Sequence, residues 1–270
     1  MADDTIPESA RRWREDLDSW AIPPEILAAA PESPWFCPPG LFTKAAEESL
    51  TVPPTPSRRR ALEPLPAGGS VLDVGAGAGA ASLPLCPPAV AVAAVDQNPE
   101  MLSAFAGLAT RQGIEHSEVE GLWPDVAGEV GPADVVVCHH VLYNVGDLVP
   151  FLLALTDHAR SRVVVEITAE HPQALLNPLW EHFHDLGRPT GPTAEDAATV
   201  ARDLGLDVGV ELWEAPPRWH NHQREEVVAF FRRRLCLPPE RDPEVADVLP
   251  AFRPGRHVTL WWPGGGAAAG

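Results

Sequence analysis

The chain has 270 residues, 38 of them acidic and 20 basic, so its formal net charge is −18. This excess of negative charge repels nucleic-acid phosphates and anionic lipids, which argues against long nucleic acids and membrane surfaces as partners. Apolar residues make up 45% of the chain, enough for one α/β-sized domain with its own core.

The four cysteines lie far apart and form no CxxC pair, which indicates reduced thiols rather than a disulfide framework or a zinc knuckle. The first residues mix acids and bases where a signal peptide needs an apolar run, and no stretch approaches the length of a membrane span. We therefore expect a cytoplasmic protein.

Residues 1–66 contain two short amphipathic stretches, at 9–20 and 25–30, and a possible helix at 43–50, separated by prolines. This pattern predicts a helical N-terminal cap without a core of its own. Residues 67–270 are then the main domain.

From Gly68 onward, short β-branched runs alternate with helical runs, which predicts a doubly wound α/β sheet with helices on both faces. The continuous apolar runs indicate strands that are covered on both sides, as in a parallel sheet. The predicted strands are 70–74, 90–96, 118–120, 134–139, 162–168, 206–214 and 257–262. Two inserted segments, near 170–192 and 215–255, interrupt the alternation and follow the fifth and sixth strands.

Two of the intervening helices have clear start signals. Asn98 precedes a first-turn proline and an acid, and Gly113 ends the same run; Thr193 and Asp196 have the spacing of a capping box.

The sharpest motif is VLDVGAGAGA, in which Gly75, Gly77 and Gly79 follow a predicted strand and precede a run predicted to be helical. Glycines at this spacing allow a tight turn and a close approach to a ligand, and a following helix would offer unpaired N–H groups. The loop also satisfies the dinucleotide pattern G-x-G-x-x-A, with Asp96 suitably placed for a ribose diol. These residues alone leave NAD binding open.

Asp73, two residues before the first glycine, favours a different ligand, because a carboxylate there can meet an ammonium group. With Asp73 included, the loop resembles motif I of the class I S-adenosylmethionine-dependent methyltransferases, D-x-G-x-G-x-G, and Asp96 matches the acidic position of motif II. The resemblance covers roughly 68–262 and implies a Rossmann-like, seven-stranded, mostly parallel sheet whose last strand inserts antiparallel beside the sixth. NAD-linked oxidoreduction stays a third alternative, weakened because the only tyrosine, Tyr143, has no lysine four residues later.

The resemblance also implies positions for S-adenosylmethionine. Asp73 and the three glycines would lie against the methionine moiety, and Asp96 would accept hydrogen bonds from the ribose hydroxyls. Gln97 and Met101 would neighbour the adenine. Many relatives end the third strand in Gly-Asp, whereas this chain has Glu120-Gly121-Leu122, so Leu122 and Trp123 are candidates for the adenine contact. This departure supports a second alternative, a catalytically inactive sensor or assembly module that binds the cofactor.

The segment CHHVLYNVGDL after the fourth strand stands where this family brings the methyl acceptor to the sulfonium. It lacks the [D/N]-P-P-[Y/F] motif common in methyltransferases that act on base or amide nitrogens. A small, partly apolar metabolite methylated on oxygen or nitrogen is therefore the expected acceptor. His139, His140 and Tyr143 are the candidate catalytic residues, since a neutral imidazole can accept a hydroxyl proton. Catalysis by positioning alone is the alternative.

Other histidines and arginines have simpler explanations. EHFH and HNH, which contain His182, His184, His220 and His222, invite a metal site, but their spacing fixes no third ligand, and we predict none. The runs 58–60 and 232–234 are expected to be exposed arginines paired with nearby acids, such as Glu63, Glu225 and Glu226. The sequence does not predict an oligomeric state.

Overall fold

The computed structural model describes residues 6–36, 39–216, 223–252 and 254–266. All the predicted strands form, with bounds that extend one to three residues beyond most of the predicted ones. They are β1 (Gly69–Val74), β2 (Ala89–Asp96), β3 (Glu115–Glu120), β4 (Ala133–His139), β5 (Ala159–Thr168), β6 (Gly209–Ala215) and β7 (Gly255–Pro263).

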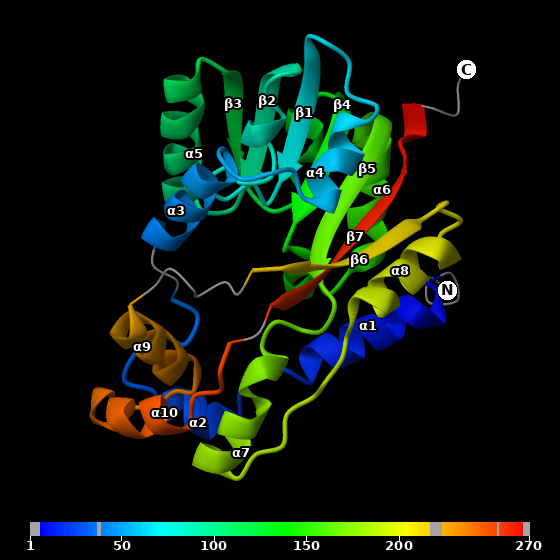
Figure 1. The fold of residues 1–270 in the computed structure, drawn as a ribbon. Helices are drawn as coiled ribbons and strands as arrows, with labels where there is room; N and C mark the ends of the chain where they lie inside the picture. The colour runs from blue at the N-terminus through cyan, green and yellow to red at the C-terminus, as the bar shows by residue number, and fades with distance from the viewer. Residues whose placement is uncertain (1–5, 37–38, 217–222, 253, 267–270) are drawn as a thin grey trace.

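These strands make one seven-stranded sheet in the order β3-β2-β1-β4-β5-β7-β6 (Figure 1). The pairs from β3 to β5 are parallel, whereas β7 runs antiparallel between β5 and β6. The predicted Rossmann-like fold with its late antiparallel strand is confirmed. Because the parallel strands share one polarity, their carboxyl ends meet at one edge, the usual ligand-binding edge of such sheets.

Alternate side chains of the central strands enter cores on opposite faces of the sheet. Leu72 and Val74 of β1 belong to the core beneath α6 (Leu148–His158), α8 (Ala194–Asp203) and α1 (Glu8–Asp18). Val71 belongs to the core beneath α4 (Pro56–Leu62) and α5 (Pro99–Gln112). Both faces are thus covered, as the apolar strand runs predicted.

The predicted helix signals form as expected. The Asn98 side chain accepts from the Glu100 N–H at 2.9 Å, and Gly113 ends α5 at φ 67°. Thr193 and Asp196 make both hydrogen bonds of a capping box at the start of α8. The Asn98 and Thr193 side chains thus satisfy backbone N–H groups that the start of a helix leaves unpaired.

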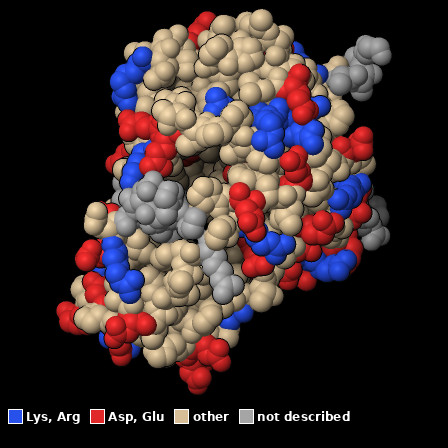
Figure 2. Space-filling model, in the orientation of Figure 1, with Lys and Arg blue, Asp and Glu red and all other residues tan. Residues whose placement is uncertain are grey.

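A second lobe lies below the sheet in Figure 1. It consists of α2 (Pro24–Ala29) from the N-terminal segment, α7 (Asn177–His184) from the first inserted segment, and α9 (Arg224–Arg234) and α10 (Asp242–Val248) from the second. Its own core includes Ile22, Trp180 and Phe231. Chain segments far apart in sequence therefore build one lobe at the carboxyl edge, and Figure 2 shows a hollow in this face between the sheet and that lobe.

The remaining N-terminal helices lie against the sheet domain. α3 (Pro39–Ser49) is held to α5 by an ion pair of 3.2 Å between Glu47 and Arg111, and α4 packs on β5 and β7. Short 3-10 turns complete the described chain: η1 (Leu83–Leu85), η2 (Ala127–Glu129), η3 (Leu142–Asn144), η4 (Ala174–Leu176) and η5 (Pro239–Arg241).

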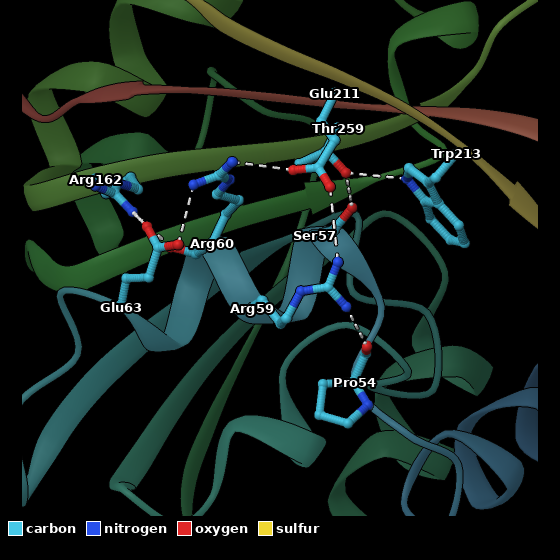
Figure 3. A network of polar contacts seen from close by, with 9 residues as sticks. All are labelled: Pro54, Ser57, Arg59, Arg60, Glu63, Arg162, Glu211, Trp213 and Thr259. Carbon is cyan, nitrogen blue, oxygen red and sulfur yellow. Dashed lines mark hydrogen bonds and ion pairs between the residues drawn. The ribbon is translucent and has the colours of Figure 1, made fainter.

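The first arginine run ties α4 to the sheet (Figure 3). Arg60 pairs with Glu63 at 3.0 Å and with Glu211 of β6 at 3.1 Å, and Arg162 of β5 also reaches Glu63. The predicted pairing with Glu63 is confirmed, and Arg60 and Arg162 are both engaged with acids.

The second arginine run departs from the prediction. Arg232 is 5% exposed and pairs with Glu32 and Asp242, and Arg233 also lies 3.5 Å from Glu32. The expected partners, Glu225 and Glu226, are in the first turn of the same helix. The arginines lie in the last turn of that helix, too far from its first turn for these pairs. Acids from other segments of the chain therefore pair with Arg232 and Arg233.

In the described ranges, no helix has both the length and the apolar character required to cross a membrane.

Candidate active site

The glycine loop follows β1 at the carboxyl edge. Gly75, Gly77 and Gly79 have φ values of 71°, 53° and 91°, a backbone region that side chains disfavour. A β-carbon on Gly75 would lie 2.3 Å from Val141, and one on Gly79 would lie 2.7 Å from Phe105. The loop therefore needs glycine for both its conformation and its surroundings.

The helix predicted after this loop is wrong. Turns and the short η1 follow instead. Pro84, Pro87 and Pro88 fall in this segment, and proline lacks the N–H that an interior helical position donates. The loop's own N–H groups, rather than those of a long helix, are left to meet a ligand.

Asp73 lies beneath the loop and is 1% exposed. Its Oδ2 accepts a 2.5 Å hydrogen bond from the Ser82 hydroxyl, whereas its buried Oδ1 has no partner among the described residues. Burial raises the pKa of Asp73 to about 7, and repulsion by Asp96 adds to the shift, while the bond from Ser82 opposes it. A buried carboxylate oxygen without a partner is costly, so this site fits a cationic group of a ligand.

Asp96 ends β2 and braces the same loop. Its Oδ2 accepts from the Gly77 N–H at 2.8 Å and its Oδ1 from the Asn98 N–H at 2.9 Å. A carboxylate has about four acceptor positions, so hydroxyl donors can still be accommodated. Of the predicted adenine neighbours, Gln97 is exposed and Met101 is buried in the first turn of α5.

The two candidates after β3 face different surroundings. Leu122 is 57% exposed. Trp123 is 9% exposed and belongs to the core, where its indole N–H donates to the Phe151 carbonyl at 3.4 Å and its ring meets His158 edge-on. Leu122 is the one of the two with a side chain available to a ligand.

Three histidines surround one buried carboxylate where β4, β5 and β7 meet. Glu166, 7% exposed, accepts from His140 Nε2 at 3.1 Å and from His257 Nδ1 at 3.3 Å, both on Oε1. His139 Nδ1 lies 3.8 Å from its Oε2. His140 has φ 60°, a strained conformation for a residue with a side chain, and its N–H donates to the Glu166 carbonyl at 2.7 Å.

Electrostatics distinguish the members of this histidine cluster. Burial opposes the ionisation of Glu166, but His139 and the hydrogen bonds from His140 and His257 hold its pKa well below the ordinary value. Burial lowers the pKa of His139 to about 4, so its ring is neutral at pH 7, and its Nε2 is buried without a partner among the described residues. His140, with 46% of its side chain exposed, is the member open to a second molecule.

A comparison with known protein families shows which family the chain belongs to. A family described as "Methyltransferase domain" matches residues 50–209, which include the glycine loop, Asp96 and the end of β4. The chain belongs to this methyltransferase family. The family predicted from Asp73 and its loop is thereby confirmed. The match does not support the NAD-linked alternative.

Solved structures of low sequence identity share the methyltransferase fold. One from Bacillus halodurans, a putative methyltransferase, has a TM-score of 0.54 at 12% identity and covers 77% of this chain and 96% of its own. A putative sarcosine dimethylglycine methyltransferase from Galdieria sulphuraria has a TM-score of 0.53 at 12% identity, covering 95% and 98%. A magnesium protoporphyrin IX methyltransferase from Synechocystis, with bound SAH, has a TM-score of 0.52 at 15% identity, covering 83% and 84%. No curated protein matches the sequence.

Tyr143 of this methyltransferase is held by the structure around it. Its hydroxyl donates to the Thr168 carbonyl at 2.7 Å, and burial raises its pKa above the ordinary value. Its ring stacks on Trp13 at 5.8 Å and meets His171 edge-on, while His171 stacks on Trp20 at 4.0 Å. The position joins α1 to the segment after β5.

Sequence inspection missed Glu166 and His257, although Glu166 had a visible signal. It is the only acid within the apolar run VVVEI, a position that normally holds a buried apolar residue. His257 had no such signal, because only the antiparallel pairing of β7 with β5 brings it to this edge. Among the other histidines, His182 is exposed and His184 hydrogen-bonds to the Leu235 carbonyl. His220 and His222 lie outside the described residues.

Proposed function

We propose that this enzyme transfers a methyl group from S-adenosylmethionine to an oxygen or nitrogen of a small, partly apolar metabolite. The proposal for the cofactor rests on the buried Oδ1 of Asp73, which has no partner among the described residues. This atom lies beneath a loop that has no room for a β-carbon at Gly75. A carboxylate so placed suits an amino-acid ammonium, and the loop suits a close backbone approach.

Different residues of the chain would bind different parts of the cofactor. Asp73 would hold the ammonium, while Gly75, Gly77 and Gly79 would lie against the methionine chain. Asp96, already fixed by two backbone N–H groups, would accept from the ribose hydroxyls. Of the remaining cofactor-binding candidates, Gln97, Met101 and Leu122 would border the adenine, and Trp123 would support this wall from the core. When bound, S-adenosylmethionine supplies an activated methyl group on a positively charged sulfur.

On the acceptor side, His139, His140 and Tyr143 remain the proposed catalytic residues, with His140 as the principal contact. Its ring is half-exposed and is oriented through Nε2 by Glu166. Neutral His139 behind it and the tethered Tyr143 would shape the site. Orientation of the acceptor would supply most of the rate, since well-oriented reactants gain about 7–11 kcal/mol from proximity.

Charge supports a small acceptor over a nucleic acid. The formal net charge is −18, and Figure 2 shows acidic and basic side chains interspersed over the face that it displays. Arg60 and Arg162 are engaged with acids in the network of Figure 3, and Arg232 is buried. Phe42 and Val141, which lie near the glycine loop, would give the site an apolar wall.

Calorimetric titration with S-adenosylhomocysteine tests the cofactor half. We expect one site of micromolar affinity, weakened at least tenfold in Asp96→Ala and unchanged in Asp207→Ala, which removes an exposed aspartate before β6. Absence of binding to the folded protein would overturn the proposal.

Transfer of a radiolabelled methyl group into a metabolite extract tests the acceptor half. Label in a small organic product, reduced at least tenfold in His140→Ala, would support it. Binding without transfer to any extract component would favour the catalytically inactive alternative, and label in RNA, DNA or protein alone would contradict a small acceptor.

A further inference from the structure

The donor atoms of His140, Glu166 and His257 all lie within 4.8 Å of one another at the carboxyl edge of the sheet. They come from the residue after β4, the last part of β5 and the start of β7, so no local sequence pattern groups them. His140 Nε2 and His257 Nδ1 both face Oε1 of Glu166, at 3.1 and 3.3 Å. We propose that these three side chains bind one divalent transition-metal ion beside the methyl-acceptor site.

The distances fit coordination of a common ion. Imidazole nitrogens and carboxylate oxygens bind zinc at about 2.0–2.1 Å, and two such donors at a tetrahedral angle are about 3.3 Å apart. The two nitrogen-to-oxygen distances on Glu166 match that spacing. The rings of His140 and His257 are nearly perpendicular, with centroids 5.2 Å apart, so they approach the carboxylate from different directions.

Charge balance favours a cation at this position. Glu166 is 7% exposed, and among the described residues its ion-pair partners are His139, His140 and His257, without an arginine or lysine. A divalent ion would compensate the buried carboxylate directly. His140 has 46% of its side chain exposed, which leaves the ion an entry path and an open coordination position.

The donor set also selects the class of metal. Two imidazoles and one carboxylate suit zinc, iron, cobalt or nickel better than magnesium or calcium, which prefer oxygen ligands. Three protein ligands leave at least one position for an exogenous molecule, as in catalytic rather than structural sites. Under the proposed function, that molecule is the acceptor, which would then bear a hydroxyl or carboxylate oxygen able to bind the ion. This extension rests on the proposed function, whereas the metal site itself does not.

Metal binding is measurable without activity. Untagged protein, treated with a chelator that is then removed, is titrated with Co²⁺ alone by calorimetry and by visible absorption. We expect one equivalent per chain with the d–d absorption of protein-bound cobalt. The affinity should fall at least tenfold in His257→Ala and in Glu166→Gln, and stay unchanged in His182→Ala, which removes an exposed histidine elsewhere.

Other outcomes decide against the site. No binding, binding that persists in His257→Ala and His140→Ala, or binding lost only when His220 and His222 are replaced together would overturn it. His140→Ala keeps the test valid if Glu166→Gln fails to fold, because His140 is half-exposed. Titration of the same samples with S-adenosylhomocysteine separates the two proposals: cofactor binding without cobalt binding refutes only the metal site, and the reverse refutes only the proposed function.

Discussion

Ser82 donates a 2.5 Å hydrogen bond to one oxygen of Asp73, and the other oxygen of that carboxylate is buried without a partner in the described chain. The arrangement keeps Asp73 in place beneath the glycine loop while leaving half of its acceptor capacity unused. The fold thus maintains a carboxyl group that a cationic ligand would stabilise.

The raised pKa of Asp73 predicts a pH-dependent stability in the ligand-free enzyme. Its pKa rises from 3.8 to about 7 on folding, so the folded state binds the proton more tightly than the unfolded state. The contribution to the unfolding free energy is therefore fully present below about pH 4 and is lost as pH rises to 7. Denaturant unfolding of wild type and Asp73→Asn checks it: the wild type should lose stability relative to the variant over this window.

Cofactor affinity should have the opposite slope, because the ammonium requires the ionised form of Asp73. S-adenosylhomocysteine binding should strengthen as pH rises through about 7 and then level off. Asp73→Asn should bind weakly at every pH across that range. Parallel pH profiles for the two proteins would contradict this role.

Gly75→Ala should disrupt the loop. The φ of 71° costs a residue with a side chain about 1–2 kcal/mol, and the new β-carbon would lie 2.3 Å from Val141. We expect S-adenosylhomocysteine affinity to fall roughly tenfold or more, measured by calorimetry. Gly128→Ala is the matched control, since nothing lies within 4 Å of its β-carbon position, and it should change the affinity little.

Arg232→Ala should lower the free energy of unfolding. Arg232 is 5% exposed and contacts Glu32 and Asp242, joining α9 to the rest of the lower lobe. Because both acids are 40% exposed and can rehydrate, we expect a loss of about 2–3 kcal/mol, below the largest values for buried pairs. Arg202→Ala breaks an exposed pair with Glu195 and should cost less than about 1 kcal/mol. Equal losses in denaturant melts would refute the distinction.

Tyr143→Phe separates a structural from a chemical role for this hydroxyl. Removal of its 2.7 Å bond to the Thr168 carbonyl should lower the unfolding free energy by about 1 kcal/mol. Methyl transfer should fall less than in His140→Ala, because the hydroxyl is already engaged by the backbone. A larger loss of rate in Tyr143→Phe, at unchanged stability, would instead indicate direct contact with the acceptor.

Local patterns predicted most of the fold. The β-branched runs gave every strand, and the caps at Asn98 and Thr193 placed α5 and α8, because these signals act within a few residues of one another. The helix predicted after Gly79 does not form, and the reason is also local, because prolines interrupt that run. The predicted partners of Arg232 were wrong. Its actual partners, Glu32 and Asp242, are 200 and 10 residues away in sequence, and only the tertiary fold brings them to this arginine.

The sequence by itself determined the family and predicted one half of the candidate site. Asp73, its glycines and Asp96 fall on two consecutive strand ends, and a short loop needs residues at fixed spacing. The other half was decided only by the tertiary structure. Glu166 and His257 are 91 residues apart and meet because β7 pairs antiparallel with β5, which brings the start of one strand to the carboxyl end of the other. The histidines around Glu166 keep it ionised against the effect of burial, whereas burial keeps His139 neutral, and both effects depend on the elements packed around these residues.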